Sequence, residues 1–313
     1  MYQITILLAS YNGEAYIEQQ ILSLLAQTYK DWVLYIRDDG SFDKTVDIIE
    51  KYVKLDDRII LVKDSLGGLG CSKNFLSLLK YSQTEFTIFC DQDDIWLENK
   101  LEVLVNEIIK RDNTIPQLVY SKSYTYNPEE NINNIEVISP VYNLQSFMFR
   151  AGGIQGCASI FNSKLKELIL IYKGYSIMHD FTLTFLALLF GEITLVDCPL
   201  TLYRIHSQNV TGERSKTKRD LYFHFFRKSK RKGIINKYAF RTMCEIAEQF
   251  NHDIIPKKKK ILDVFFSFPD LNKCQMIFTI LKYRFTLYGS SFPIVLKVLT
   301  RKTWEEEEKF VNR

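Results

Sequence analysis

Over roughly the first ninety residues, short continuous apolar runs alternate with segments in which apolar residues recur every three or four positions. Runs such as Ile4–Ala9 are typical of strands buried on both faces, whereas the spacing of Ile17, Ile21 and Leu24 predicts a helix. This alternation predicts an α/β fold whose mostly parallel central sheet is covered by helices. The expected strands are Ile4–Ala9, Trp32–Arg37, Arg58–Lys63 and Phe86–Cys90, and the expected helices contain Glu14–Gln27, Val46–Val53 and Phe75–Leu79.

After Asn99 the alternation becomes less regular. The pattern predicts a helix over Lys100–Arg111, a strand over Leu118–Tyr124 and a polar loop through Asn127–Asn134. Together with the preceding elements, they complete one domain that spans residues 1–212. Further strands are expected at Ala158–Phe161, Ile193–Asp197 and Leu202–Ile205, and further helices at Lys164–Tyr172 and Phe181–Phe190.

The net charge of +4 conceals an uneven distribution along the chain. Residues 1–212 hold 18 Lys and Arg against 26 Asp and Glu, whereas residues 213–260 hold 15 against 5. This contrast predicts a second part, a helical and basic C-terminal region over residues 213–313, with partners of its own. Aromatic residues stand beside its basic run Arg227–Lys232, a mixture that favours contact with an anionic membrane surface. A packed helical subdomain with a solvated basic face is the alternative, and no nucleic-acid partner is expected because no recognised binding motif accompanies the charge.

The composition narrows the class of protein further. No apolar run is long enough to cross a membrane, and Met1 leads directly into the first expected strand without a secretion signal. We therefore expect a cytoplasmic protein. Its six cysteines contain no C-x-x-C pair, so we expect reduced thiols, mostly buried packing residues, and no zinc site.

Three polar clusters follow three of the expected strands: Ser10-Tyr11-Asn12, Asp38-Asp39-Gly40-Ser41 and Asp91-Gln92-Asp93-Asp94. In parallel sheets the ligand crevice lies beyond the carboxyl ends of the strands, so these clusters are expected to meet there. The carboxylates of the last cluster would repel one another unless a cation were present, and oxygen ligands suit Mg²⁺ or Mn²⁺. By pattern alone, a solvated acidic turn explains this cluster equally well.

Two further residues and one segment can each be interpreted in two ways. Asp180 precedes the apolar helix Phe181–Phe190, where it would serve either as a plain helix cap or as a carboxylate kept ionised by the helix N-terminus. Trp96 would either stack on a sugar or belong to the core. The segment Gly152–Cys157 is either an ordinary turn or a loop that admits a ligand close to the backbone.

The order of these motifs resembles the family 2 inverting glycosyltransferases of the GT-A fold. The resemblance covers residues 4–99 and, more loosely, the chain up to residue 212. The combination of Asp91–Trp96 with the late His179-Asp180 and Tyr203–His206 is similar to the polysaccharide rhamnosyltransferase branch. The matching motifs are Ile4–Asn12, Asp38–Ser41, Gly70 with Lys73-Asn74, Asp91–Trp96, His179-Asp180, and Tyr203–His206 with Asn209.

This resemblance implies a metal-dependent transfer of a sugar from a dTDP- or UDP-sugar to a lipid-linked or growing surface polysaccharide, with dTDP-rhamnose as the favoured donor. It implies Asp180 as the catalytic base. It gives His179 no clear role, because much of the family has glutamate there. The implied metal ligands for Mg²⁺ or Mn²⁺ are Asp93, Asp94 and His206, and the implied nucleotide-sugar contacts are Ala9, Ser10, Tyr11, Glu14, Asp38, Lys73, Asp91, Gln92 and Asp93.

Three alternative functions can be compared with the sequence. A UDP-hexose transferase of the same fold would use the same residues. A nucleotidyltransferase would need a glycine-rich phosphate loop after the first strand, where Ser10–Glu14 stands instead. A noncatalytic nucleotide-sugar-binding protein would tolerate loss of Asp180 or of the aspartate cluster, and the sequence keeps both.

Overall fold

The computed structural model describes residues 2–127, 131–135, 140–206 and 233–304. The chain divides into two compact units. The first unit comprises Met1–Ile138, Ile154–Lys173 and Met178–Ser215, and the second comprises Ser139–Gly153, Gly174–Ile177 and Lys216–Arg313. The predicted boundary after residue 212, Asn209 and the basic run Arg227–Lys232 lie outside the described residues.

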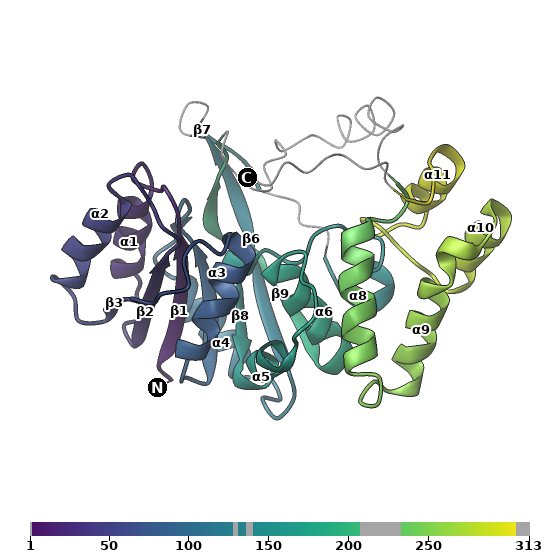
Figure 1. The fold of residues 1–313 in the computed structure, drawn as a ribbon, viewed down its shortest axis with the longest axis horizontal. Coiled ribbons are helices and arrows are strands. Elements are labelled where there is room, and N and C mark those ends of the chain that lie inside the picture. The colour runs from purple at the N-terminus through teal and green to yellow at the C-terminus, as the bar shows by residue number, and fades with distance from the viewer. Residues whose placement is uncertain (1, 128–130, 136–139, 207–232, 305–313) are drawn as a thin grey trace. The chain divides into compact units, whose positions relative to one another are not determined.

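The first unit is built around a sheet of nine strands with helices on both faces (Figure 1). Its strands are β1 (Ile4–Ser10), β2 (Trp32–Asp38), β3 (Ile59–Leu61), β4 (Phe86–Asp91), β5 (Ile95–Trp96), β6 (Gln117–Asn127), β7 (Asn131–Ile135), β8 (Ser159–Asn162) and β9 (Glu192–Arg204). Its helices are α1 (Ile17–Leu25), α2 (Thr45–Val53), α3 (Cys71–Leu78), α4 (Lys100–Ile108), α5 (Ser163–Ile171) and α6 (His179–Phe190).

The sheet is mixed, so the prediction of a mostly parallel sheet is wrong. The strand order is β3-β2-β1-β4-β8-β6-β9-β5, with β7 beside β6. The first four strands run parallel, but β8 runs antiparallel to both β4 and β6, and β5 runs antiparallel to β9. A strand covered on both faces has the same apolar sequence in either direction, which is why the pattern did not reveal the orientation of β8.

Two local predictions also need correction. The expected polar loop at Asn127–Asn134 contains part of β7, which pairs with β6 through backbone hydrogen bonds that need no apolar side chains. The two strands expected at Ile193–Asp197 and Leu202–Ile205 form one long strand, β9, whose pairing with β6 shifts register twice. Such irregularities let a strand bend without ending.

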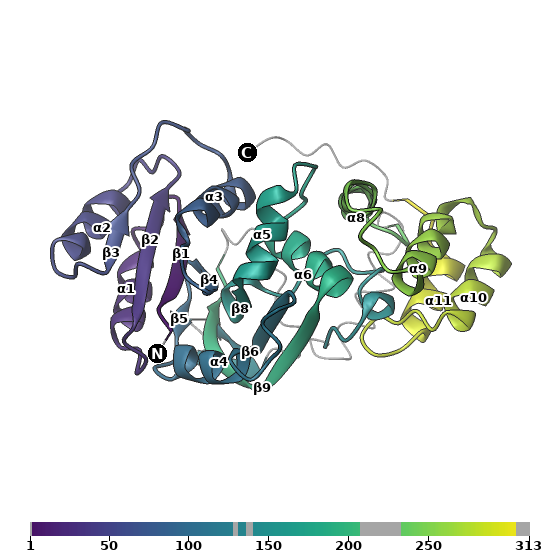
Figure 2. The same cartoon turned by 90° about the horizontal axis from the view of Figure 1, so that it is seen from below.

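Helices cover the sheet on two sides (Figure 2). Ile4, Ile6 and Leu8 of β1 share one hydrophobic cluster with apolar residues of α1, α2 and α4. On the other face, Phe89 of β4 packs against Phe75 of α3, with ring centroids 5.2 Å apart. Burial on both faces explains the continuous apolar runs, because successive side chains of a strand point to opposite faces.

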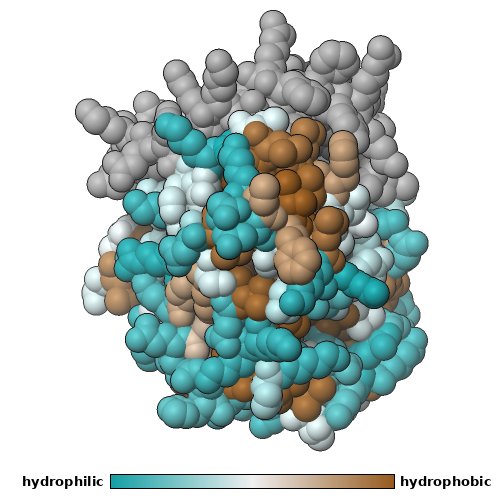
Figure 3. Space-filling view, turned by 90° about the vertical axis from the view of Figure 1, so that its right-hand side faces the viewer, coloured by the Kyte–Doolittle hydropathy of each residue, from teal (hydrophilic) through white to brown (hydrophobic). Residues whose placement is uncertain are grey.

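The second unit contains helices α8 (Lys237–Gln249), α9 (Pro256–Phe266), α10 (Lys273–Lys282) and α11 (Phe292–Thr300). Its core is aromatic: the ring of Phe149 lies 5.1–5.5 Å from the rings of Phe265, Phe268 and Phe285 in edge-to-face geometry. Among the described residues, no helix is long and apolar enough to cross a membrane. Figure 3 looks at the α10 and α11 side and shows apolar side chains gathered among hydrophilic ones.

The cysteines are less buried than expected. All six are free, in agreement with the prediction of reduced thiols. Cys90 and Cys157 are buried, but Cys71 and Cys274 are exposed.

Candidate active site

The carboxyl ends of β1, β2 and β4 bring the three polar clusters together at one edge of the sheet. The register of the parallel strands places Ser10 opposite Asp38 and Ala9 opposite Asp91. Chain reversals after each strand carry the remaining residues of each cluster beyond the same edge. The carboxyl edge of the sheet, where the sequence predicted a ligand crevice, therefore carries polar side chains on three adjacent strands.

Asp38 is held by its own turn. Its two carboxylate oxygens accept hydrogen bonds from the hydroxyls of Ser10 and Ser41, at 3.0 and 2.6 Å, and from the amides of Gly40 and Ser41, at 3.0 and 2.7 Å. A carboxylate has about four acceptor positions, so these donors fill them. A nucleotide that donated a hydrogen bond to Asp38, one of the predicted contacts, would have to replace one of these donors.

A network of buried side chains beside Asp38 holds the glycine-rich turn Gly67–Gly70. The guanidinium of Arg37 binds Asp64 through two nitrogens and binds Asp39 at 2.7 Å. Asp39 also accepts hydrogen bonds from the amides of Leu69 and Gly70, at 2.8 and 2.7 Å. The network therefore holds the turn that leads into α3. This helix carries Lys73, a predicted nucleotide contact, whose side chain is exposed. The doublet Asp38-Asp39 was visible in the sequence, but which aspartate faces inward was not.

Gln92 holds the loop after β1. Its side-chain amide donates to the carbonyl oxygen of Tyr11 and accepts from the amide of Tyr11, both at 2.9 Å. Gly13 makes this approach possible, because a Cβ at this position would lie 2.2 Å from Oε1 of Gln92. Glu14, another predicted contact, accepts a hydrogen bond from the amide of Lys44 at 2.9 Å. Gln92 thus positions the loop in which Tyr11 is half exposed.

Replacing Gln92 by alanine is expected to lower donor affinity by about tenfold, because two hydrogen bonds that order the loop are lost. Gly13→Ala should have a similar effect, since the added Cβ displaces the Gln92 side chain. Calorimetric titration with UDP and dTDP would measure both. Gln83→Ala, at an exposed glutamine outside the loop, is the matched control. Unchanged affinity in both variants would rule out this positioning role.

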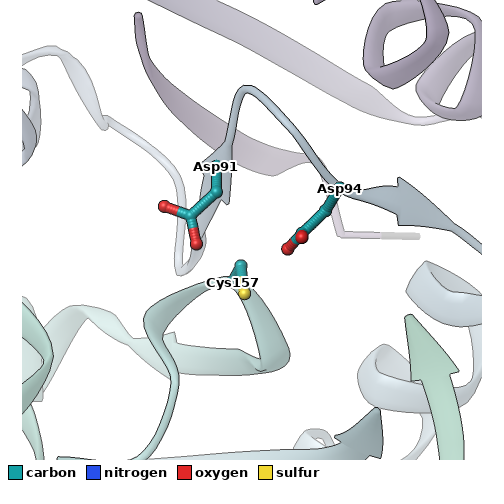
Figure 4. A group of neighbouring side chains, drawn as sticks. All are labelled: Asp91, Asp94 and Cys157. Carbon is teal, nitrogen blue, oxygen red and sulfur yellow. The ribbon is translucent and has the colours of Figure 1, made fainter. Parts of the chain in front are cut away.

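The aspartate cluster separates into two groups. In the inner group, a carboxylate oxygen of Asp91, one of Asp94 and the sulfur of Cys157 lie within 4.8 Å of one another (Figure 4). Burial and the neighbouring carboxylate of Asp91 raise the pKa of Asp94. Burial and the charge of Asp93 raise the pKa of Asp91 to about 7. One oxygen of Asp94 accepts from the amide of Arg204 at 3.2 Å, and the other is buried without a hydrogen-bond partner among the described residues.

A buried cation lies behind the inner group. Nζ of Lys100 donates to the carbonyl oxygen of Cys157 and to the hydroxyl of Thr201, and it lies 3.7 Å from the ring centroid of Trp96. Burial lowers the pKa of Lys100 to about 8. Trp96 is itself buried, so of the two interpretations given above it belongs to the core. Cys157 ends the segment Gly152–Cys157 considered above, but nothing in the sequence placed its thiol or Lys100 beside the aspartate cluster.

The outer group joins Asp93 to His206. Oδ2 of Asp93 lies 2.8 Å from Nε2 of His206, and both side chains keep some exposure. The histidine ring stacks on Tyr16 with centroids 4.6 Å apart, and Nε of Arg204 donates to the carbonyl oxygen of Asp93 at 2.8 Å. The structure thus places two of the three predicted metal ligands, Asp93 and His206, side by side, while Asp94 points into the inner group.

Asp180 lies in the first turn of α6, after Met178 at the N-cap position. Asp180 therefore does not hold the N-cap position itself. Burial raises the pKa of Asp180 to about 6, partly opposed by hydrogen bonds from backbone amides at the helix start. Its Oδ1 has no hydrogen-bond partner in the described part of the chain. His179, the residue before Asp180, packs on Phe89 of β4 with ring centroids 4.9 Å apart, so α6 begins beside the strand that ends at Asp91.

His179 is a neutral packing residue. Its ring lies 4.2 Å from the ring of Phe75 and 4.9 Å from that of Phe89, measured between centroids. Burial lowers the pKa of His179 to about 3. A Cβ on Gly156 would lie 2.8 Å from its Nε2, so glycine is required at that position. His179 anchors the start of α6 between two aromatic rings and brings no charge to the site.

Residues 5–169 match the protein family described as Glycosyl transferase family 2. Because the match spans more than half of the chain, the chain belongs to this family. A UDP-Glc:alpha-D-GlcNAc-diphosphoundecaprenol beta-1,3-glucosyltransferase from Escherichia coli is 27% identical over 84% of this chain and 96% of its own length. A dTDP-rhamnosyl transferase from Shigella flexneri is 28% identical over 79% of this chain and 85% of its own length.

Solved structures show the same fold. TarS 1–349 from S. aureus, in complex with UDP-GlcNAc, aligns with a TM-score of 0.59 and 18% identity over 90% of this chain and 73% of its own. The mannosyltransferase PcManGT from Pyrobaculum calidifontis, in complex with GDP-Man and Mn²⁺, aligns with a TM-score of 0.56 and 14% identity over the same shares. The fold is therefore the GT-A fold, and the protein is an enzyme of the glycosyltransferase class.

Proposed function

We propose that this enzyme is a metal-dependent, inverting glycosyltransferase that moves a sugar from a dTDP- or UDP-sugar onto a lipid-linked or growing surface polysaccharide. The observation that carries the proposal is that Asp38 and the aspartate cluster lie at the carboxyl ends of neighbouring strands, with the start of α6, which holds Asp180, packed beside β4. dTDP-rhamnose is the favoured donor, and similarity to the Shigella dTDP-rhamnosyl transferase supports it. Similarity to the Escherichia coli glucosyltransferase, which acts on a diphosphoundecaprenol-linked sugar, supports a lipid-linked acceptor and keeps UDP-glucose as the second candidate donor.

The donor nucleotide would bind along the loop after β1 and the turn after β2. Asp38 is proposed to face the base, with Ser10, Tyr11 and Glu14 near the nucleoside and Lys73 near the base or diphosphate. Ala9, Asp91 and Gln92 would border this site at the strand ends. The hydrogen bonds of Asp38 and Gln92 keep the loops in place before the ligand arrives, which limits the entropy lost on binding.

A divalent cation fits the outer group. Asp93 and His206 present an oxygen and a nitrogen 2.8 Å apart, both partly exposed, and Mn²⁺ or Mg²⁺ accepts carboxylate ligands while imidazole suits the softer Mn²⁺. Asp94 would support this site from within. When bound, such a cation would act as a Lewis acid that neutralises charge on the departing diphosphate.

Asp180 is proposed as the general base. The acceptor hydroxyl attacks the anomeric carbon, the bond from that carbon to the diphosphate oxygen breaks, and the hydroxyl proton passes to the Asp180 carboxylate. A single displacement of this kind inverts the anomeric configuration. A pKa of about 6 leaves most of the carboxylate ionised at neutral pH and still basic enough to take a proton.

The deciding experiment is a donor panel with a lipid-linked acceptor, with Mn²⁺ or Mg²⁺ present or removed by chelator. dTDP-rhamnose, UDP-glucose, UDP-galactose and UDP-N-acetylhexosamines would be compared by release of nucleoside diphosphate and by mass of the glycolipid product. We expect one donor to give metal-dependent transfer. Binding of a nucleotide-sugar without any transfer would instead support the noncatalytic alternative.

A further inference from the structure

Helix α11 is apolar on two opposite faces. Ile294 and Val298 point into the second unit and are fully buried. The opposite face of the helix is also apolar, because Phe292, Val295, Leu296 and Leu299 recur there at helical spacing. Phe292 and Leu299 at its ends are each 56% exposed. A helix that needs only one face for packing therefore presents another to the surroundings.

Helix α10 repeats this arrangement. Met276 and Ile280 form its buried face. Cys274, Phe278 and Leu281 lie on the opposite face with helical spacing, and Phe278 and Leu281 are 63% and 58% exposed. The two helices contact each other, and Figure 3 shows the apolar surface on this side of the unit. We call the outward-facing residues of both helices the apolar stripe: Cys274, Ile277, Phe278, Leu281, Phe292, Val295, Leu296 and Leu299.

The segment that carries the apolar stripe is cationic, although Asp270 precedes it and Glu305–Glu308 follow it in the sequence. Residues 271–304 contain six Lys and Arg and no Asp or Glu. Lys282 is the last residue of α10 and Arg284 follows the helix, and both are exposed. An apolar helical face surrounded by cations matches the interface of an anionic bilayer, where apolar side chains enter the acyl boundary and cations remain at the headgroups.

We propose that the apolar stripe is the membrane-docking face of this protein and that it inserts into anionic lipid. The proposal deepens the proposed action on a lipid-linked acceptor, but it rests on different residues from those of the catalytic site. It narrows the membrane contact expected of residues 213–313 to α10 and α11, while the basic run Arg227–Lys232 lies outside the described residues. A second copy of the chain is a poorer match, because two such faces would bring like charges together.

Vesicle sedimentation tests the proposal, with vesicles of neutral phosphatidylcholine and of phosphatidylcholine containing phosphatidylglycerol. The wild type should bind the anionic vesicles more tightly, and added salt should reduce that preference. Phe278→Ser with Phe292→Ser should weaken binding to both vesicle types by about a hundredfold, because the variant loses two aromatic side chains that would insert into the lipid. Lys282→Gln with Arg284→Gln should weaken only anionic binding, by about fivefold per cation.

Leu22→Ser with Leu55→Ser, at exposed leucines of the first unit, is the matched control and should bind like wild type. Circular dichroism and thermal melting would show that each variant is folded. Nucleoside diphosphate release from the donor in detergent-free buffer should be unchanged in the stripe variants, which separates failure of docking from failure of the proposed function. Equal vesicle binding by wild type and the Phe278 and Phe292 double variant would overturn the proposal. So would a dimer, seen by light scattering, that this variant abolishes without any vesicle binding by wild type.

Discussion

Asp180→Asn is expected to lower kcat by about 10²–10⁴-fold, the usual contribution of a positioned general base. The amide has nearly the same shape as the carboxylate but cannot take the proton from the acceptor hydroxyl. Donor binding should change little, because the predicted nucleotide contacts lie on β1, β2 and β4, in the loops that follow these strands and on α3, and not on α6. Measurement of kcat with the glycolipid acceptor, together with the Kd for UDP or dTDP, would show this separation.

The same residue sets the expected pH dependence. Burial raises the pKa of Asp180 to about 6, and only the ionised form acts as a base. The kcat of wild type should therefore fall as the pH decreases through about 6, and the residual activity of Asp180→Asn should lack that inflection. An unchanged profile in the variant would assign the base to another group.

The melting temperature of Asp180→Asn shows whether a loss of activity comes from a loss of stability. Because the folded-state pKa of Asp180 is raised above its unfolded value of about 3.8, the ionised carboxyl destabilises the folded protein at neutral pH. Asp180→Asn should consequently melt at the same temperature as wild type or slightly higher. Asp47→Asn, at an exposed aspartate in the first turn of α2, should retain wild-type kcat. A large loss of melting temperature would mean that Asp180 has a structural role instead.

Asp93→Asn is expected to lower metal-dependent kcat/KM by about 10²–10³-fold, since a bound cation contributes several kcal/mol to stabilisation of the leaving group. Among the aspartates that follow β4, Asp93 is the one in contact with His206, and both remain accessible to a diphosphate. Titration of activity with Mn²⁺ and with Mg²⁺ would give the apparent metal affinity. His206→Asn should shift the metal affinity in the same direction.

We expect Asp94 to contribute less to metal binding than Asp93. Burial favours the protonated form of Asp94, which asparagine resembles, so Asp94→Asn should have a smaller effect than Asp93→Asn. Cys157→Ser is the matched control in the inner group and should keep the metal affinity. If Asp94→Asn and Cys157→Ser abolished the response to Mn²⁺ while Asp93→Asn did not, the cation would belong to the inner group.

The sequence by itself determined most elements of the first unit and the edge of the sheet where chemistry is concentrated. Continuous apolar runs marked β1, β2 and β4 because both faces of these strands are covered, and a polar cluster follows each of them. Local periodicity carries this information, since burial of one stripe or one run depends on residues that are close together along the chain.

Tertiary structure alone decided the direction of β8 and the partners within the aspartate cluster. Asp93 meets His206 and Asp94 meets Cys157 across 113 and 63 positions of sequence, and periodicity has no access to such separations. Consecutive residues in a turn point in different directions, so Asp93 faces the accessible site while Asp94 faces a buried thiol and Lys100. The motif thus identified which residues gather at the site, and the path of the backbone after β4 decided which carboxylate is accessible to a ligand and which is buried.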